Sequence, residues 1–213
     1  MIQKTKFDHS GGLYFYRFHE NKLKNLSNGY SNLYFYLNEM LTNCPHDYFL
    51  QGPRSSNLKF KLDGVNTFQI VGHEVSELTK RGLEFNRKRF KSNHMKVQVF
   101  MLENDDKTIA MEIPLWLEPN EINNFNKIFK EEFPLTGHID ILRIDDNKIW
   151  IWDYKPKAYN EKYAVTQVYF YALMLSKRTN ISLDKIRCGY FDENYAFVFN
   201  PKEEFINKRL IDF

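Results

Sequence analysis

The sequence predicts an α/β fold in which helices flank a mixed central β-sheet. Three observations favour this class. Two apolar strands form a hairpin within residues 137–155, residues 160–179 form a helix with few breakers, and residues 186–199 form a second strand pair. Helices and strands that alternate in this way build a layered α/β domain.

Length and composition favour one domain spanning residues 1–213. A hydrophobic content of 43% with 27% charged residues is ordinary for a soluble globular protein. No run reaches the ~18–20 apolar residues of a membrane span, and the first ten residues lack the apolar centre of a secretory signal. The two cysteines are far apart and indicate no disulfide framework. We therefore expect a cytoplasmic protein with reduced thiols and no membrane partner.

The first 90 residues contain two predicted helices. Residues 1–30 are punctuated by Ser-Gly-Gly and Ser-Asn-Gly, and their role is not evident from the sequence. Residues 31–43 are predicted to be helical, whereas residues 51–65 are loop-like and could cover a site. A second helix is predicted over Phe68–Phe90.

The middle of the chain is predicted to form strands. Met95–Glu103 and Thr108–Glu118 form a strand pair joined by a polar turn. Asn120–Glu132 is polar and helix-like, and we interpret it as an insertion. After the second strand pair, residues 201–213 form a C-terminal tail that could contain a short helix.

The turn sequence of the hairpin predicts which residues of its two strands face each other. Asp and Asn at residues 146–147 tolerate left-handed turn conformations. Side chains alternate along a strand, so a turn centred there fixes the residues that face each other. These are Asp145 with Lys148, Ile144 with Ile149, Leu142 with Ile151, and Asp140 with Asp153.

The facing carboxylates Asp140 and Asp153 need an explanation. Directly opposed side chains have Cβ atoms about 5 Å apart, and like charges there are destabilising. The isoleucines on the same face mark it as mostly buried, and two buried carboxylates so close do not both ionise without help. One of them is protonated, or a divalent cation lies between them, with Lys155 as a further positive charge. Oxygen ligands favour Mg²⁺ or Mn²⁺; the alternative is two exposed acids on a solvated face.

Three motifs carry a resemblance to a known family. Gly-x-Ile-Asp at residues 137–140, followed by Asp-x-Lys at residues 153–155, resembles the PD-(D/E)XK nuclease superfamily. Gln167 and Tyr171 share one face of the next helix, and this Gln-x-x-x-Tyr pattern resembles the third motif of the RecB-like exonuclease branch. The alternative for this pair is a core tyrosine beside a surface glutamine. The resemblance implies a restriction-endonuclease-like core.

Two upstream features are similar to the same branch. His73, one turn before Glu77, resembles the early-helix histidine that reaches the metal in RecB-like nucleases; the alternative is a structural or exposed histidine. Residues 31–50 resemble the start of many RecB-like domains, in which a cysteine such as Cys44 can hold an iron–sulfur cluster. That cluster takes four thiolates, and this chain has Cys44 and Cys188 alone, so we expect no iron–sulfur cluster.

The resemblance implies roles for individual residues. The expected catalytic residues are Asp140, Asp153 and Lys155. The expected ligands of a Mg²⁺ or Mn²⁺ ion are His73, Asp140, Asp153 and the backbone carbonyl of Tyr154, and Gln167 and Tyr171 are expected to bind the substrate strand. Lys155 would hold or deprotonate the attacking water. Glu112, which begins a Glu-x-Pro sequence, is not included among these expected site residues.

The expected function is a metal-dependent DNA nuclease, an exonuclease acting on DNA ends or single strands. The alternatives are a structure- or sequence-specific endonuclease, a non-catalytic nucleic-acid-binding module of the same fold, and a hydrolase of a small phosphate ester. A net charge of +3 does not by itself indicate DNA binding. The basic residues of positions 80–91 could hold a phosphate backbone or form a solvated helix face.

Overall fold

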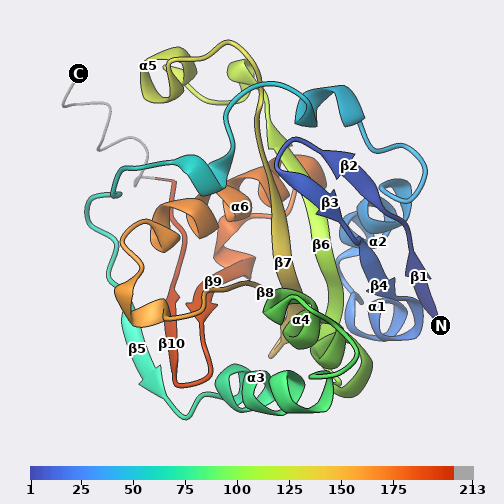
Figure 1. The fold of residues 1–213 in the computed structure, drawn as a ribbon. Helices are drawn as coiled ribbons and strands as arrows, with labels where there is room; N and C mark the ends of the chain where they lie inside the picture. Colours follow the sequence, from blue (N-terminus) through green and yellow to red (C-terminus); the bar gives the residue numbers. More distant parts are fainter. Residues whose placement is uncertain (204–213) are drawn as a thin grey trace.

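An eight-stranded mixed sheet forms the centre of the computed structural model, which describes residues 1–203 (Figure 1). Neighbouring strands are antiparallel except β8 and β9, which are parallel. In spatial order the strands are β1 (Ile2–Lys4), β4 (Arg17–His19), β6 (Thr108–Leu117), β7 (Leu135–Asp145), β8 (Lys148–Tyr154), β9 (Ile186–Phe191), β10 (Tyr195–Phe199) and β5 (Phe68–Val71). This arrangement confirms the predicted α/β class with a mixed central sheet.

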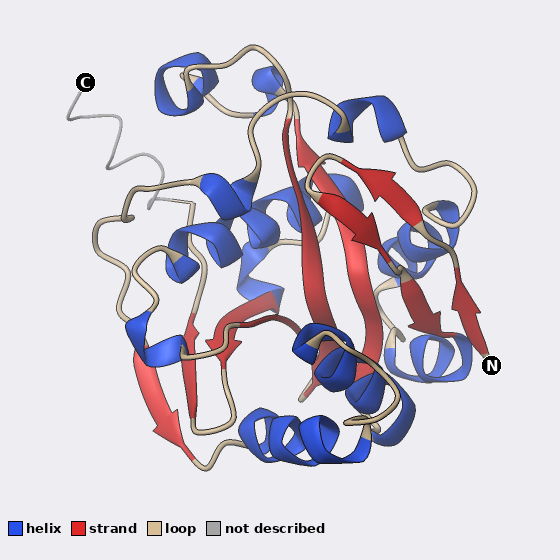
Figure 2. Ribbon diagram, in the orientation of Figure 1, coloured by secondary structure: helices blue, strands red, loops and turns tan. Residues whose placement is uncertain are grey.

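Helices cover both faces of the sheet (Figure 2). One face packs against α2 and α6 in the largest core cluster, and the other packs against α3 and α4. The α-helices are α1 (Glu20–Leu26), α2 (Ser31–Glu39), α3 (Glu74–Phe85), α4 (Asn93–Asn104), α5 (Phe125–Phe129) and α6 (Ala164–Thr179). Short 3-10 helices are η1 (His46–Phe49), η2 (Ser55–Asn57), η3 (Pro119–Glu121), η4 (Ala158–Asn160) and η5 (Leu183–Lys185).

The β7–β8 hairpin has the predicted register. Its turn residues Asp146 and Asn147 have φ values of 48° and 55°, as a two-residue turn with two left-handed positions requires. The ladder of paired residues ends before Asp140 and Asp153, which lie just beyond it. The observed pairs are Asp145 with Lys148, Ile144 with Ile149, Arg143 with Trp150, Leu142 with Ile151, and Ile141 with Trp152.

The crossover helix α6 connects the parallel strands β8 and β9. Parallel neighbours need a long connection, usually a helix that packs back onto the sheet. Helix α6 begins at Ala164, four residues later than the predicted start at Asn160. Lys157 takes a left-handed conformation with φ of 72°, and η4 turns the chain before the helix begins. The final strand pair has the predicted bounds.

Two of the predicted elements are wrong. Residues 68–90 are not one helix, because Phe68–Val71 pairs with β10 as the edge strand β5. Residues 95–103 are not a strand but belong to α4. The apolar side chains of that segment alternate, but Val97 and Met101 lie four residues apart and pack together against the sheet. Tertiary packing on both sides of α4 outweighs its strand-like pattern.

The first 30 residues build one side of the molecule. Strands β1 and β4 extend the central sheet beside β6, whereas β2 (Phe7–His9) and β3 (Gly12–Tyr14) form a separate hairpin.

The predicted helix at residues 31–43 is present as α2, and the segment 120–132 contains only η3 and α5. From residue 204 on, the expected tail 201–213 lies outside the described residues. Within residues 1–203, no helix is long and apolar enough to cross a membrane.

Candidate active site

The predicted motifs converge on one cavity of about 480 Å³. It lies between the β2–β3 hairpin, the N-terminus of α4, the sheet and α6. Its lining residues are Gly11, Gly12, Leu13, Tyr14, Phe15, Arg54, Ser56, Ser92, His94, Met95, Glu112, His138, Asp140, Asp153, Lys155, Gln167 and Tyr171. We refer to this cavity as the motif pocket, because five residues predicted from the sequence motifs line it: Asp140, Asp153, Lys155, Gln167 and Tyr171.

Strand β8 and helix α6 place four of these side chains in contact. Lys155 follows the end of β8, and its Nζ lies 2.7 Å from Oδ2 of Asp153, a side chain that is almost fully buried. The Gln167 amide donates to Asp153 Oδ1 at 3.3 Å and to the Tyr171 hydroxyl at 2.8 Å. Residues 167 and 171 are one turn apart on α6, so their side chains reach the pocket together. The carboxylate of Asp153 is therefore held from two sides.

Asp140 approaches from β7. Its Oδ2 accepts a hydrogen bond from the Tyr154 backbone N–H at 2.9 Å, which orients the carboxylate toward the end of β8. The Nε2 atom of His94 lies 3.8 Å from the same oxygen. His94 belongs to the first turn of α4, so this helix brings an imidazole to the carboxylate that the sequence places on the hairpin.

Glu112 adds a third carboxylate from β6. It has a left-handed φ of 54°, an uncommon value for a residue with a side chain. Before it, Met111 packs with α4 residues, and after it Ile113 packs into the core on the α6 side. Met111 and Ile113 therefore face opposite sides of the sheet, whereas residues two apart in a regular strand face the same side. The Glu112 side chain between them lines the motif pocket. There its Oε1 accepts a hydrogen bond from the Gln98 amide at 2.6 Å.

Two acids in the motif pocket, Asp140 and Glu112, hold their protons more tightly than usual. Burial raises the pKa of Asp140 to about 6, and repulsion from Asp153 acts in the same direction. Burial, followed by repulsion from Asp140, raises the pKa of Glu112 to about 8. Burial alone would lower the pKa of Lys155, but Asp153 and Asp140 outweigh it and raise that pKa. The ammonium therefore stays charged between the acids.

This donor set suits a hard divalent cation. Three carboxylates line one pocket, and the cost of keeping them ionised there is visible in the raised pKa values of two of them. A bound cation lowers that cost, because an opposite charge nearby favours the ionised form of a carboxyl group. Carboxylate oxygens are the ligands that Mg²⁺ and Mn²⁺ prefer. The residues present therefore fit such an ion.

His73 does not line the motif pocket. Its Nδ1 accepts a hydrogen bond from the Val75 N–H at 3.2 Å, so the imidazole caps the N-terminus of α3. Its ring packs 5.2 Å from the ring of Trp152, in the core beneath α3 and α4. Because residues 68–71 are a strand, His73 comes at the start of α3 and not within a helix that reaches the acids. His94 is the histidine that α4 brings to Asp140.

The sequence interpretation also missed polar residues from the N-terminal side. Tyr14 stacks on His138 with ring centroids 3.7 Å apart, and Arg54 donates hydrogen bonds to the Tyr14 hydroxyl and to the Ser10 carbonyl. These contacts join segments far apart in the chain, and no local pattern predicts them. The sequence did carry a signal for His94, since Ser92 is an N-cap residue type that directly precedes α4.

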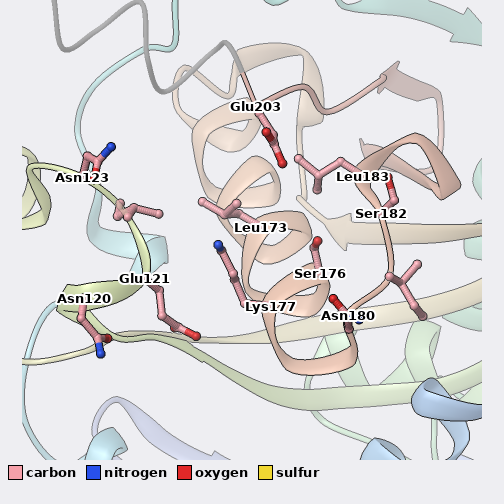
Figure 3. A pocket seen from close by; sticks show the side chains of 12 residues that line it. Asn120, Glu121, Asn123, Leu173, Ser176, Lys177, Asn180, Ser182, Leu183 and Glu203 are labelled. Carbon is pink, nitrogen blue, oxygen red and sulfur yellow. The ribbon is translucent and has the colours of Figure 1, made fainter.

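A second cavity, of about 490 Å³, lies at the C-terminal end of α6 (Figure 3). The α6 residues Ser176 and Lys177 line it, together with Glu121 from the segment before α5. None of the residues predicted from the motifs lines this cavity. We therefore assign the chemistry to the motif pocket.

Comparison with known proteins agrees with this geometry. The family model of the PD-(D/E)XK nuclease superfamily matches residues 68–206, which is more than half of the chain. A search of curated proteins found no match. The matched region includes β6, β7, β8 and α6, the elements that hold the acids and the lysine of the motif pocket. Nucleases of this superfamily use divalent metal ions. The chain belongs to the PD-(D/E)XK nuclease superfamily.

Proposed function

We propose that this protein is a Mg²⁺- or Mn²⁺-dependent deoxyribonuclease of the RecB-like branch that degrades DNA from free ends or as single strands. The observation that carries the proposal is the meeting of Asp140, Asp153 and Lys155 with the Gln167–Tyr171 pair in one pocket. The order of the three motifs along the chain supports the RecB-like assignment.

Asp140, Asp153 and the backbone carbonyl of Tyr154 would hold the cation. Bound there, a divalent cation lowers the pKa of its water and polarises a phosphoryl oxygen. The Tyr154 N–H holds Asp140 in position at 2.9 Å, and the Gln167 amide does the same for Asp153. The Nε2 atom of His94 lies 3.8 Å from Oδ2 of Asp140, so in this proposal His94 and not His73 is the histidine beside the cation.

Lys155 acts as an electrostatic group in this proposal. Its raised pKa keeps the ammonium protonated near neutral pH, so it is poorly suited to remove a proton from water. A fixed ammonium beside the acids can orient the attacking water and offset negative charge on the phosphate in the transition state. Of the two roles expected for Lys155, we therefore retain holding the water and stabilising charge.

Gln167 and Tyr171 position the DNA strand. Burial, and then the charge of Asp153, raise the pKa of Tyr171, so its hydroxyl remains neutral and available as a donor. Its partner Gln167 holds the hydroxyl at 2.8 Å. The exposed basic residues Arg87, Lys88 and Lys91 directly precede the part of α4 that lines the pocket, where they can contact phosphates leading into it.

The two histidines give a paired prediction. His94→Ala is expected to lower the rate of DNA cleavage about 10-fold or more, because the imidazole lies beside Asp140 in the pocket. His73→Ala is expected to leave the rate within about twofold and to lower the melting temperature, because it removes an N-cap worth about 1 kcal/mol. Single-turnover cleavage and thermal melting of both variants measure these effects. A larger rate loss in His73→Ala would return the ligand role to His73.

A substrate panel tests the proposed function. Linear single-stranded, linear duplex and closed circular DNA are incubated with the protein in EDTA, Mg²⁺ or Mn²⁺. The expected result is metal-dependent loss of the linear substrates and an intact circle. Cleavage of the circle would support an endonuclease instead. Salt-dependent binding without any cleavage would support a non-catalytic module, and absence of DNA binding would favour a small phosphate ester as substrate.

A further inference from the structure

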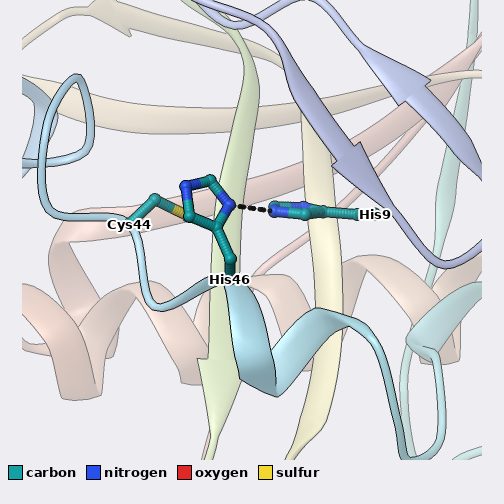
Figure 4. A group of neighbouring side chains, drawn as sticks. All are labelled: His9, Cys44 and His46. Atoms are coloured by element: carbon teal, nitrogen blue, oxygen red, sulfur yellow. Dashed lines mark hydrogen bonds between the residues drawn. The ribbon is translucent and has the colours of Figure 1, made fainter.

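A group of side chains that could hold a metal ion lies next to His138, which itself lines the motif pocket. His9, Cys44 and His46 each offer one ligand atom, and these atoms lie within 4.8 Å of one another. His9 ends β2, Cys44 lies in the loop after α2, and His46 begins η1. Figure 4 shows the three side chains gathered between that loop and the end of β2.

The distances suit a small tetrahedral ion. His9 Nε2 lies 3.0 Å from Nδ1 of His46, so in the metal-free chain one proton lies between the two nitrogens. Zinc binds imidazole nitrogen at about 2.0–2.1 Å and thiolate sulfur at about 2.3 Å, so tetrahedral ligand atoms lie roughly 3.3–3.8 Å apart. Small side-chain movements would bring all three ligand atoms into that range.

The surroundings of His9 resemble those of a metal-ligating histidine. Such a histidine uses its second ring nitrogen for a hydrogen bond that fixes the tautomer. Here Nδ1 of His9 lies 2.9 Å from Nε2 of His138, and the His9 ring is stacked on Phe49 with centroids 4.2 Å apart. Burial and the neighbouring His46 keep His9 neutral, with its pKa lowered to about 4. A neutral imidazole is the form that binds metals.

We propose that His9, Cys44 and His46 bind a zinc ion, at a site separate from the cation site of the acids. One thiolate and two imidazoles are ligands that zinc prefers, whereas the carboxylates of the motif pocket suit Mg²⁺ or Mn²⁺. The buried His9 and Cys44 would form the inner part of the site. The exposed His46 leaves a path for the ion to enter and room for water as a fourth ligand.

Such an ion would fix one wall of the motif pocket. It would tie the β2–β3 hairpin to the segment after α2, which contact each other through this cluster. Gly12, Leu13 and Tyr14 of the hairpin line the motif pocket, and Tyr14 stacks on His138. The inferred zinc therefore has a structural role that does not depend on the nuclease reaction.

Metal analysis of untagged protein tests the site. The protein is stripped with a chelator, reconstituted with zinc, dialysed and analysed by mass spectrometry. We expect about one zinc per chain in wild type, in the matched cysteine control Cys188→Ala and in Asp153→Asn. Cys44→Ala and His46→Ala are expected to lose the zinc. Retention of zinc by Cys44→Ala, or its loss in Asp153→Asn, would overturn the proposal, as would a wild type that binds none.

Cobalt gives a second readout that does not depend on how the variants fold. Wild-type protein reconstituted with Co²⁺ is expected to show a thiolate-to-cobalt charge-transfer band and the visible bands of a tetrahedral ion. The bands should persist when excess Mg²⁺ is added, because Mg²⁺ competes for the acids and not for the thiolate. Bound cobalt without a thiolate band would exclude Cys44 as a ligand and overturn the site.

Discussion

Replacing Lys155 by methionine is expected to lower the rate of DNA cleavage about 10²–10³-fold, the loss that follows removal of one preorganised charge or donor from an active site. Methionine keeps much of the buried stem and removes the ammonium that lies 2.7 Å from Asp153. Cation binding is expected to remain or to tighten, since the acids lose a competing positive charge. Single-turnover cleavage and Mn²⁺ titration of the variant measure the two effects separately.

Lys162→Met is the matched control for that variant. Lys162 is exposed, lies between β8 and α6 and does not line the motif pocket. An exposed lysine outside the pocket can contribute at most a surface contact with a DNA phosphate. Its replacement is therefore expected to leave the rate of cleavage within about twofold of wild type. If Lys155→Met cleaves DNA as fast as this control, Lys155 has no part in the chemistry. If it fails to bind Mn²⁺, Lys155 instead supports the cation site.

The metal-free protein is expected to lose stability as pH rises from about 4.5 to about 8, and Glu112→Gln is expected to remove much of that loss. The folded state raises the pKa of Glu112 from its ordinary 4.5 to about 8, so between these values it binds more protons than the unfolded chain. Stability therefore falls with rising pH across that interval. Asp140 acts in the same direction between 3.8 and about 6.

Thermal melting in EDTA at several pH values checks this expectation. At pH above 8, Glu112→Gln should melt at least about 3 °C higher than wild type, and near pH 4.5 the two should be similar. The exposed Glu84→Gln on α3 is the control and should follow the wild-type curve. A Glu112→Gln variant that is less stable than wild type at high pH would show that the carboxylate is not strained in the folded protein.

The parts of the site that could be predicted from the sequence depend on local geometry. The register of β7 and β8 follows from a two-residue turn and from side chains that alternate, so it fixes where Asp140 and Asp153 lie relative to each other. The i, i+4 spacing of Gln167 and Tyr171 is equally local, and the two side chains meet on α6. Such features need no knowledge of the rest of the fold.

The parts that were missed depend on distant packing. The segment at residues 95–103 alternates like a strand, and only its burial between α3 and the sheet makes it a helix, so His94 was not recognised. The left-handed φ of Glu112 lies where the regular alternation of side chains along β6 is broken, and no sequence pattern predicts that position. Strands of three residues, as in β1 and β2, are too short to give a periodic signal.

The most direct measurement compares cleavage of an end-labelled linear DNA by wild type and by Asp153→Asn, in EDTA and in Mg²⁺, with DNA binding measured in parallel. Asparagine keeps the shape of the buried side chain and can still accept the Gln167 hydrogen bond. We expect wild type to cleave the DNA in Mg²⁺ and not in EDTA, and Asp153→Asn to cleave it in neither. Both proteins are expected to bind the DNA equally well. Wild-type cleavage in EDTA, or full cleavage by Asp153→Asn in Mg²⁺, would contradict a metal-dependent nuclease centred on Asp140, Asp153 and Lys155.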